Sequence, residues 1–240
     1  MKAELHSHFL PRMDDGAETP SESLAILSYL AAHGIKTVAA TPHYHYHVES
    51  VDSFLERRER SFELLRSHLR ETGVDEGTLP RLVPGAEVRI YRGMTECCDV
   101  SKLCYGNSRY ILLEMPFVPF ERYIIDEIDN IRYQYGLIPV IAHINRYLPY
   151  YSKKDMEQLV FGEGLIFQIN GEAALLHRTS LRRMRGLVKS DAPFLFGFDI
   201  HDDRDSRGYG VEKFPSLFDG VSESRLCELA ALENEVVSAF

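Results

Sequence analysis

Short apolar runs alternate with longer amphipathic stretches along most of the chain. The apolar runs are rich in β-branched residues, and they predict seven strands, at residues 3–7, 36–41, 82–87, 110–114, 138–142, 165–169 and 194–198. The amphipathic stretches predict six helices, at residues 20–33, 52–72, 120–135, 153–161, 172–189 and 222–237. This alternation is typical of α/β proteins built on parallel strands, and that fold class is therefore expected.

The helix at 20–33 has the clearest ends. Thr19 precedes Pro20 and Ser21, which is a helix-start pattern, and His33 is followed by Gly34. Residues 88–109 show no sustained period, so no element is assigned there. The chain has 240 residues and contains no repeat, linker or low-complexity tract. A single domain over residues 1–240 is expected, because α/β barrels of this size are often one unit.

Chemically active side chains follow the predicted strands. In barrels of alternating strands and helices, the C-terminal ends of the strands converge on one face. Six of the seven strands deliver a histidine or a carboxylate there, and only the sixth ends on a neutral residue, Asn170. The candidates, from five histidines and four carboxylates, are His6, His8, Asp15, His43, Glu87, Glu114, His143, Asp199 and His201.

Each candidate has an ordinary explanation when it is taken alone. The HxH of His6 and His8 can be two unrelated side chains, DDG at 14–16 is a common turn, and Glu87 or Glu114 can form a salt bridge. Together they favour a metal centre, because imidazole and carboxylate suit zinc, manganese and iron. Nine ligands exceed the needs of one ion, so two or three bridged ions are expected. Three divalent ions against four carboxylates would leave a positive site that attracts phosphate.

Composition excludes several other classes of protein. The net charge is −9, with 36 acidic and 27 basic residues, which disfavours nucleic acid as the main partner. No apolar stretch approaches the roughly 18 residues of a membrane span. The first residues lack a secretory apolar region, and the four cysteines form no CxxC pair, so a reduced, cytoplasmic location is expected.

Other phosphate and ester chemistries lack their motifs. No cysteine is followed six positions later by arginine, as a thiolate-based tyrosine phosphatase would need. The chain also contains neither a GxSxG nucleophile elbow nor a GxxxxGK[ST] phosphate loop. The remaining histidines have other predicted places: His33, His68 and His177 on helices, and His45 and His47 in a loop wall near the cleft.

The motifs ELHSH with DDG, TPHY, GAEV, LLEMPF, IAHINRY and FDIHD occur in this order. They resemble the polymerase and histidinol phosphatase (PHP) superfamily, most closely its bacterial tyrosine-protein phosphatases of the CpsB, CapC and YwqE type. The resemblance implies a distorted (β/α)7 barrel, with the nine candidates as ligands of a trinuclear centre. Manganese is the most expected metal, with iron, zinc or magnesium as alternatives.

The resemblance also assigns roles in binding the substrate. Arg146 would hold the phosphoryl group, and a second arginine, Arg207 or Arg204, would follow the last histidine. The chain departs from the family pattern at Glu4, Arg12, Asn145 and Phe198, of which Arg12 and Phe198 can reshape the rim of the pocket. None of these departures removes a ligand.

The expected reaction is hydrolysis of phosphotyrosine, on the tail of a bacterial polysaccharide-export tyrosine kinase. A hydroxide activated by metal ions would attack phosphorus, and arginines would stabilise the transition state. Asp199 and His201 are candidate proton donors. The alternatives are a phosphoesterase acting on a small molecule such as histidinol phosphate, and a non-catalytic protein that binds phosphopeptides. A homo-oligomer is possible.

Overall fold

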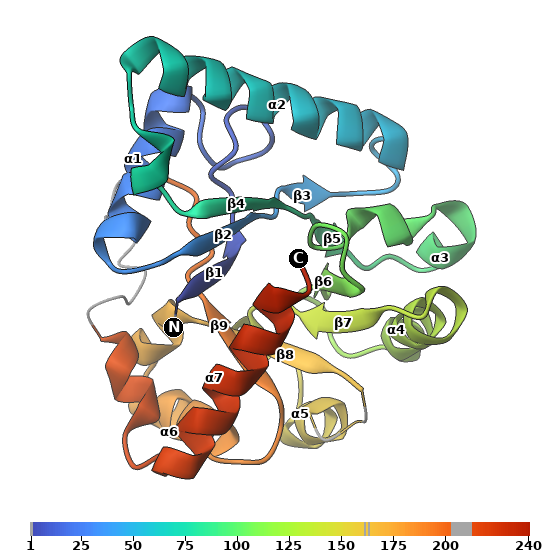
Figure 1. Ribbon diagram of the computed structural model, residues 1–240. Helices are drawn as coiled ribbons and strands as arrows, with labels where there is room; N and C mark the ends of the chain where they lie inside the picture. The colour runs from blue at the N-terminus through green and yellow to red at the C-terminus, as the bar shows by residue number, and fades with distance from the viewer. Residues whose placement is uncertain (1, 161, 163, 203–212) are drawn as a thin grey trace.

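Nine parallel strands and seven α-helices make up the described part of the chain (Figure 1). The computed structural model describes residues 2–160, 162, 164–202 and 213–240. The strands are β1 (Ala3–Ser7), β2 (Thr37–Ala40), β3 (His43–Tyr44), β4 (Arg81–Pro84), β5 (Glu87–Arg89), β6 (Tyr110–Glu114), β7 (Ile138–Ile141), β8 (Ile166–Asn170) and β9 (Phe194–Gly197). The α/β class predicted from the sequence is confirmed.

The strands form two sheets instead of one closed barrel. One sheet has the order β1-β2-β4, and the other has the order β3-β5-β6-β7-β8-β9. An isolated parallel bridge between Ser7 and Ile200 brings β1 beside the loop that follows β9. Among the described residues, no further strand pairing closes the ring, so the expected closed arrangement is not seen.

The chain passes from the first sheet to the second at two breaks, one after β2 and one after β4. The apolar run that ends at residue 41 stops at Ala40, and β3 starts after Pro42, which has no N–H to donate to a ladder. The predicted strand 82–87 was wrong as a single element, because β4 ends at Pro84 and β5 begins at Glu87. His43 and Glu87 are paired in register across β3 and β5. Both breaks therefore place site residues at the start of the second sheet.

The helices agree with the sequence pattern except in two regions, residues 88–109 and 172–189. They are α1 (Pro20–Ala32), α2 (Val51–Thr72), α3 (Met94–Cys97), α4 (Arg122–Tyr135), α5 (Lys153–Val160), α6 (Arg178–Val188) and α7 (Glu223–Ser238). α1 begins with a capping box between Thr19 and Glu22. The unassigned region 88–109 contains the end of β5, α3 and a 3₁₀ turn, Val100–Leu103.

The helix predicted at 172–189 is two separate elements. A 3₁₀ turn, Gly171–Leu175, follows β8 directly, and α6 starts only after His177, whose backbone has a ψ of 149°. The sequence pattern predicted the 3₁₀ turn and α6 as one helix because both segments are amphipathic. The extended backbone at His177 changes the chain direction between them, and the 3₁₀ turn holds Glu172 beside the site described below.

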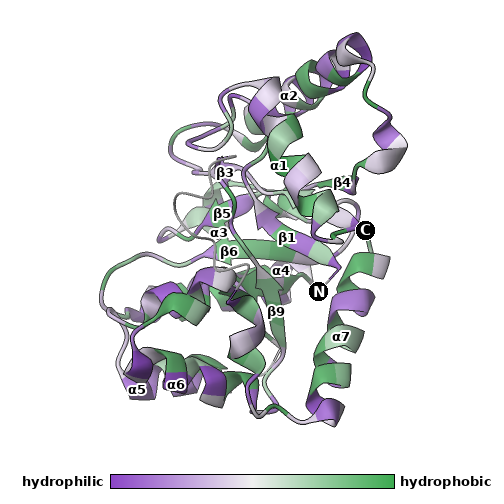
Figure 2. Ribbon diagram, turned by 90° about the vertical axis from the view of Figure 1, so that its left-hand side faces the viewer, coloured by the Kyte–Doolittle hydropathy of each residue, from purple (hydrophilic) through white to green (hydrophobic). Residues whose placement is uncertain are grey.

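The helices cover the outer surfaces of the sheets and leave the strands buried. All five residues of β1, β6 and β8 are buried, as expected for parallel strands that are covered on both faces. Figure 2 shows β6 and β9 largely in the hydrophobic colour, whereas α2 carries much of the hydrophilic colour. In the described ranges, no helix combines the length and apolar character needed to cross a membrane.

Candidate metal centre

His6 and His8 lie two residues apart at the end of β1, so the period of a strand directs both side chains to the same face. Both are fully buried. The DDG turn then folds back over them: Asp14 Oδ2 lies 2.8 Å from His8 Nδ1 and also accepts a hydrogen bond from the His43 N–H at 2.8 Å. A Cβ at Gly16 would lie 2.0 Å from the His8 carbonyl oxygen, so only glycine allows this close approach.

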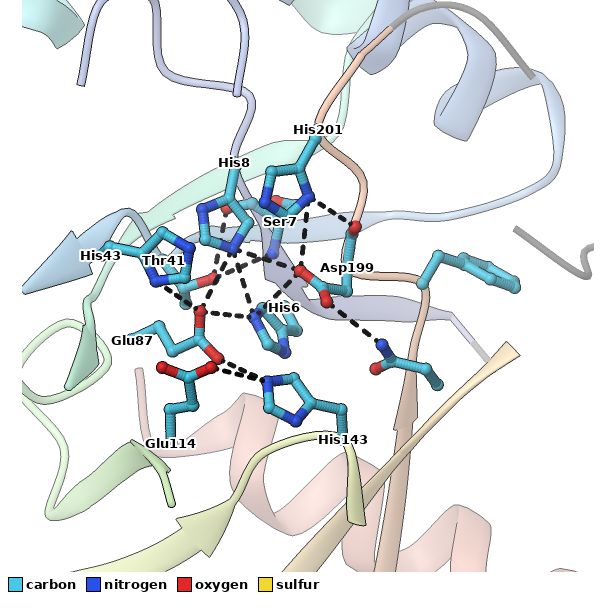
Figure 3. A network of polar contacts seen from close by, with 12 residues as sticks. His6, Ser7, His8, Thr41, His43, Glu87, Glu114, His143, Asp199 and His201 are labelled. Carbon is cyan, nitrogen blue, oxygen red and sulfur yellow. Dashed lines mark hydrogen bonds and ion pairs between the residues drawn. The ribbon is translucent and has the colours of Figure 1, made fainter. Parts of the chain in front are cut away.

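Glu87 lies at the middle of the cluster (Figure 3). Its Oε2 lies 3.2 Å from His6 Nε2, 3.4 Å from His8 Nε2 and 2.9 Å from His43 Nδ1. Its other oxygen, Oε1, lies 2.9 Å from His143 Nε2. One carboxylate therefore faces imidazoles from three separate segments of the chain, β1, β3 and the segment after β7.

Asp199 faces the same histidines from the opposite side. Its Oδ1 lies 3.2 Å from His6 Nε2 and 3.2 Å from His8 Nε2. Its Oδ2 lies 2.6 Å from Arg146 Nη1 and accepts a hydrogen bond from Asn170 Nδ2 at 3.2 Å. The Asp199 carboxylate therefore joins the histidine cluster to the arginine that the resemblance assigned to phosphate.

The more open edge of the cluster is formed by Asp15, His43 and His201. Asp15 Oδ1 lies 3.5 Å from His43 Nε2 and 3.4 Å from His201 Nε2, and its side chain is 70% exposed. The His8 and His201 rings stack with centroids 4.0 Å apart. This edge is where a ligand from solvent can reach the cluster.

All nine residues predicted from the strand ends lie in this one cluster. Their donor atoms fall into four groups in which all atoms lie within 4.8 Å of one another. The groups are His8, Asp15, His43 and His201; His6, His143 and Asp199; His6, His8 and Glu87; and His43, Glu87 and Glu114. Several residues belong to two groups, which is the arrangement that bridging ligands of neighbouring ions need.

The donor set fits divalent cations. Glu87 Oε2, Asp199 Oδ1, His43 Nδ1 and His143 Nδ1 are buried, and none makes a hydrogen bond to another described residue. Buried polar atoms without hydrogen bonds are costly, and a cation is one way to compensate them. Mixed imidazole and carboxylate ligands suit zinc, iron and manganese.

The electrostatics of the cluster follow from burial and from this mixture of charges. Burial alone lowers the pKa of His6, but the Asp199 and Glu87 carboxylates outweigh it and raise that pKa to about 9. Burial alone raises the pKa of Asp199 and of Glu87, but the neighbouring histidines hold both well below the usual range. Without cations, a proton on His6 therefore offsets part of the buried negative charge.

Three buried polar residues that the sequence did not single out as site residues orient the cluster. Gln168 Oε1 accepts a hydrogen bond from the His143 N–H at 2.7 Å and lies 3.2 Å from His6 Nδ1. Gln168 Nε2 donates to Asn170 Oδ1 at 2.6 Å. Glu4 accepts hydrogen bonds from the N–H groups of His6 and Phe198, each at 2.8 Å. A polar residue inside an otherwise apolar strand, as in IFQIN, was the signal available for Gln168.

Burial raises the pKa of Glu4 to about 8, so this side chain is mostly protonated at neutral pH. In the sequence, Glu4 stood out only as a departure from the family pattern. A Cβ at Gly197 would lie 2.7 Å from Glu4 Oε1, so glycine at this position makes room for the carboxyl group. Glu4 thus fixes the end of β1 against the chain that leaves β9.

A cavity of about 210 Å³ opens beside the cluster. It is lined by Asp15, His43, Glu114, Arg146, Glu172, Asp199 and His201. Arg146 Nε donates to Glu172 Oε1 at 2.7 Å, and Arg89 Nη1 lies 2.5 Å from Glu114 Oε2. The sequence predicted Arg146 here but missed Glu172 and Arg89, which are far from it in the chain and show no motif.

The other residues predicted to bind the substrate or to shape the pocket do not line this cavity in the described part of the chain. Arg12 is exposed, has a φ of 62° and does not line this cavity. Arg204 and Arg207 lie outside the described residues. Phe198 is buried and packs edge-on against Phe214, with ring centroids 5.5 Å apart, so it lies in the core and not on the rim of the pocket.

The remaining histidines lie outside the metal-ligand groups. His33 and His177 are exposed at helix ends, and His68 lies on α2. His45 Nδ1 lies 2.9 Å from the Tyr91 hydroxyl, and its ring centroid lies 5.8 Å from that of His43. This agrees with the predicted loop wall beside the cluster.

The fold and the site together define a class: α/β proteins that gather a cluster of imidazole and carboxylate side chains, of the kind that binds metal ions, at one edge of parallel sheets. Within this class, the chain belongs to the CpsB/CapC family, described as capsular polysaccharide synthesis, which it matches over residues 2–213. The family predicted from the motifs is therefore confirmed.

Two relatives with known names are similar in sequence. The chain is 32% identical over 146 residues to tyrosine-protein phosphatase YwqE of Bacillus subtilis, a match that covers 60% of this chain and 54% of that protein. It is 24% identical over 245 residues to tyrosine-protein phosphatase CpsB of Streptococcus pneumoniae, with 90% of this chain and 94% of that protein covered. The match to YwqE thus spans about half of its length, whereas the match to CpsB spans nearly all of it.

A solved structure has the same fold. It comes from work described as crystal structures of YwqE from Bacillus subtilis and CpsB from Streptococcus pneumoniae, unique metal-dependent tyrosine phosphatases. The TM-score is 0.73 at 23% identity, and the match covers 99% of this chain and 95% of that chain. At this level of identity, the likeness establishes the fold.

Proposed function

We propose that this protein is a metal-dependent protein-tyrosine phosphatase. The observation that carries the proposal is the meeting of nine metal-type donors and Arg146 at one small cavity. The names of the relatives YwqE and CpsB support the same activity. The nine ligands are His6, His8, Asp15, His43, Glu87, Glu114, His143, Asp199 and His201, and three ions, with manganese the most expected, would fit their overlapping groups.

The bound ions would lower the pKa of water and supply a hydroxide nucleophile for phosphorus at neutral pH. Arg146 binds a phosphoryl oxygen, because its guanidinium lines the same cavity and is held in place by Asp199 and Glu172. A planar guanidinium suits the charge that spreads over the phosphoryl oxygens in the transition state.

Leaving-group departure needs little help in this reaction. The phenol of tyrosine has a pKa of about 10, so it leaves more readily than an alkoxide. Asp199 and His201 line the cavity, and any proton for the leaving group would reach it through a metal-bound water beside them. Arg207 or Arg204 is proposed as a second phosphate-binding arginine, and Arg12 as a contact for the bound protein at the outer rim.

The proposed substrate is a phosphotyrosine on the tail of a bacterial tyrosine kinase that serves capsule or exopolysaccharide synthesis. The family description supports this choice. The proposed location is the cytoplasm, and the proposed unit is one domain over residues 1–240. We also propose that the two sheets are an opened (β/α)7 barrel, with the Ser7–Ile200 bridge at the seam.

The test is a Glu87→Gln variant, which keeps the size of the side chain and removes one charge at the middle of the cluster. Metal content and turnover of a phosphotyrosine peptide should both fall. Turnover should fall by about 100-fold or more, because the loss of a residue that only orients a metal ligand already costs about 10–100-fold in metal affinity or activity. Glu63→Gln, on the exposed side of α2, is the matched control and should change neither. A folded Glu87→Gln protein with full metal content and activity would contradict the ligand role.

The same assay separates the alternatives. Faster turnover of histidinol phosphate than of a phosphotyrosine peptide, both with manganese, would assign the site to a small molecule. Tight binding of the phosphopeptide with no turnover after metal loading would identify a non-catalytic binding protein.

A further inference from the structure

A second hollow shares Arg146 with the metal cavity. It is a groove of about 720 Å³ between the segments that follow β6, β7 and β8. Its apolar lining consists of Phe117, Leu148, Pro149, Tyr150, Leu175 and Leu176. None of these residues was predicted to have a role in binding.

The groove adjoins the proposed active site. Arg146 and Glu172 line both the groove and the metal cavity, so their ion pair forms the wall between the two. An aromatic row leads outward from the cluster: the Phe117 ring stacks on His143 at 5.7 Å and contacts Tyr150 at 5.8 Å. A substrate anchored at Arg146 therefore has an apolar surface directly beside it.

The metal cavity is smaller than the groove, so the two would receive different parts of the substrate. Ligand pockets usually occupy about 300–1,000 Å³, and the metal cavity, at about 210 Å³, is smaller than this range. It has room for a phosphorylated side chain but not for a peptide. The rest of a phosphotyrosine peptide must lie outside it, and the groove has the volume to receive a neighbouring part of the peptide.

The groove also exposes apolar side chains that have no evident structural use. Tyr150 is 44% exposed and Leu175 is 45% exposed, and they are two of the seven large hydrophobic residues that are exposed in the described part of the chain. Two such residues that face one groove next to a site are typical of a binding surface and not of scattered surface residues.

We propose that this groove binds the part of the substrate peptide that flanks the phosphotyrosine, and that it selects an apolar side chain there. The proposal rests on the proposed phosphatase function and extends it from the phosphoryl group to the surrounding peptide. Arg146 fixes the phosphoryl group, and the apolar contact with Tyr150 and Leu175 adds affinity for the peptide.

The experiment compares two variants of the groove, Leu175→Ser and Tyr150→Ser, with two matched controls on other surfaces. Leu226→Ser on α7 and Tyr133→Ser on α4 remove side chains of the same two types, which are 40% and 75% exposed. Each protein is loaded with manganese. The substrates are p-nitrophenyl phosphate, a phosphotyrosine peptide with leucine beside the phosphotyrosine, and the same peptide with serine in place of leucine.

For the wild-type protein, kcat/KM should be about tenfold higher for the leucine peptide than for the serine peptide, since one well-buried apolar side chain is worth about that factor. In the groove variants, this preference for the leucine peptide should fall about fivefold or more, because KM for that peptide rises. The ratio of peptide turnover to p-nitrophenyl phosphate turnover should also fall. The control variants should keep both ratios of the wild-type protein.

Three results would overturn the proposal. The first is an unchanged peptide preference in both groove variants, and the second is an equal loss on the peptide and on p-nitrophenyl phosphate. The third is a change in the sedimentation of the groove variants with no change in preference, which would make the groove a contact between copies of this chain.

A binding measurement keeps this test separate from the phosphatase proposal. Calorimetry with a leucine peptide that carries non-hydrolysable phosphonomethyl-phenylalanine reports the groove without turnover. If the wild-type protein binds this peptide but hydrolyses no phosphotyrosine, the proposed function fails. In that case, a several-fold weaker affinity in Leu175→Ser still supports the groove, and an unchanged affinity contradicts it.

Discussion

His143 and Asp199 both have positive backbone φ angles, 31° and 55°, which residues other than glycine rarely adopt. Such backbone strain costs on the order of 1–3 kcal/mol per residue and persists only where the surroundings enforce it. Here Gln168 accepts a hydrogen bond from the His143 N–H, and Asn170 and Arg146 hold the Asp199 carboxylate. At the residue scale, the site is therefore held by polar partners from β8 as well as by the donors themselves.

Replacing Gln168 by leucine should weaken metal binding while the protein stays folded. The change removes the acceptor for the His143 N–H and the contact with His6 Nδ1, and the loss of such orienting partners typically costs about 10–100-fold in affinity or activity. A metal titration of the metal-free protein measures the effect. Gln134→Leu, on the exposed side of α4, is the control and should bind metal like the wild-type protein.

Unchanged metal affinity in Gln168→Leu would show that backbone strain at His143 is relieved in some other way. A variant that no longer folds would be uninformative about orientation, so Gln168→Glu is a useful second change. It keeps the acceptor oxygen and should retain more metal affinity than leucine does.

At the element scale, Arg225 joins α7 to the end of α6 and to the segment between α6 and β9. This arginine is only 8% exposed, donates through Nε to the Val188 carbonyl at 3.1 Å and through Nη2 to the Ala192 carbonyl, and lies 3.0 Å from Glu228. The sequence predicted α7 correctly to within a residue or two. It did not reveal that one arginine on this helix is buried, because arginine is usually exposed.

Arg225→Ala should lower the free energy of unfolding by about 2–3 kcal/mol, because two buried carbonyl groups lose a charged donor. Urea denaturation followed by circular dichroism measures it. Arg60→Ala on α2 removes an exposed ion pair with Glu56 and should change stability by less than about 0.5 kcal/mol. An Arg225→Ala protein as stable as the control would mean that water replaces the lost hydrogen bonds.

At the scale of the whole molecule, the proposed centre connects distant parts of the fold. Its donors come from β1 and the turn after it, from β3, β5 and β6, and from the segments that follow β7 and β9. A ligand that binds only the folded state stabilises it, by about 2.7 kcal/mol at 100 times its Kd. Bound ions should therefore raise the stability of the entire chain.

Removing metal with a chelator should lower Tm by about 5–10 °C, given that about 1 kcal/mol corresponds to about 2–4 °C for a chain of this size. Differential scanning calorimetry measures the shift, and adding manganese back in excess should restore the original Tm. The Glu87→Gln variant should show little response to either treatment. Equal Tm values with and without chelator in the wild-type protein would argue against bound structural ions.

Burial also decides how the cysteines react. Burial raises the pKa of the Cys104 thiol to about 12, and the nearby Asp99 carboxylate adds to the shift. Since the thiolate is the reactive form, Cys104 should be inert at pH 8, whereas the exposed Cys97 and Cys227 should react.

Mass spectrometry after alkylation at pH 8 checks this pattern. Cys97 and Cys227 should be modified within minutes, and Cys104 only after denaturant is added. Rapid modification of Cys104 in the native protein would mean that the segment around the 3₁₀ turn Val100–Leu103 opens easily.

The sequence by itself determined the fold class, and it picked out the nine candidate ligands that the structure brings together. Apolar periodicity located the parallel strands, and the ends of such strands share one edge. Residues as distant as His6 and Asp199 could therefore be placed together from the order of the strands alone. The motifs also identified the family, and the resemblance to that family singled out Arg146.

Only the tertiary structure decided how these parts are held. The break into two sheets, the orienting roles of Glu4, Gln168 and Asn170, and the groove beside Arg146 all depend on contacts between residues far apart in the chain. Local patterns do not encode such contacts, because a polar side chain in a buried strand looks the same whether it orients a ligand or bonds to its own backbone. Packing in three dimensions sets which of these occurs.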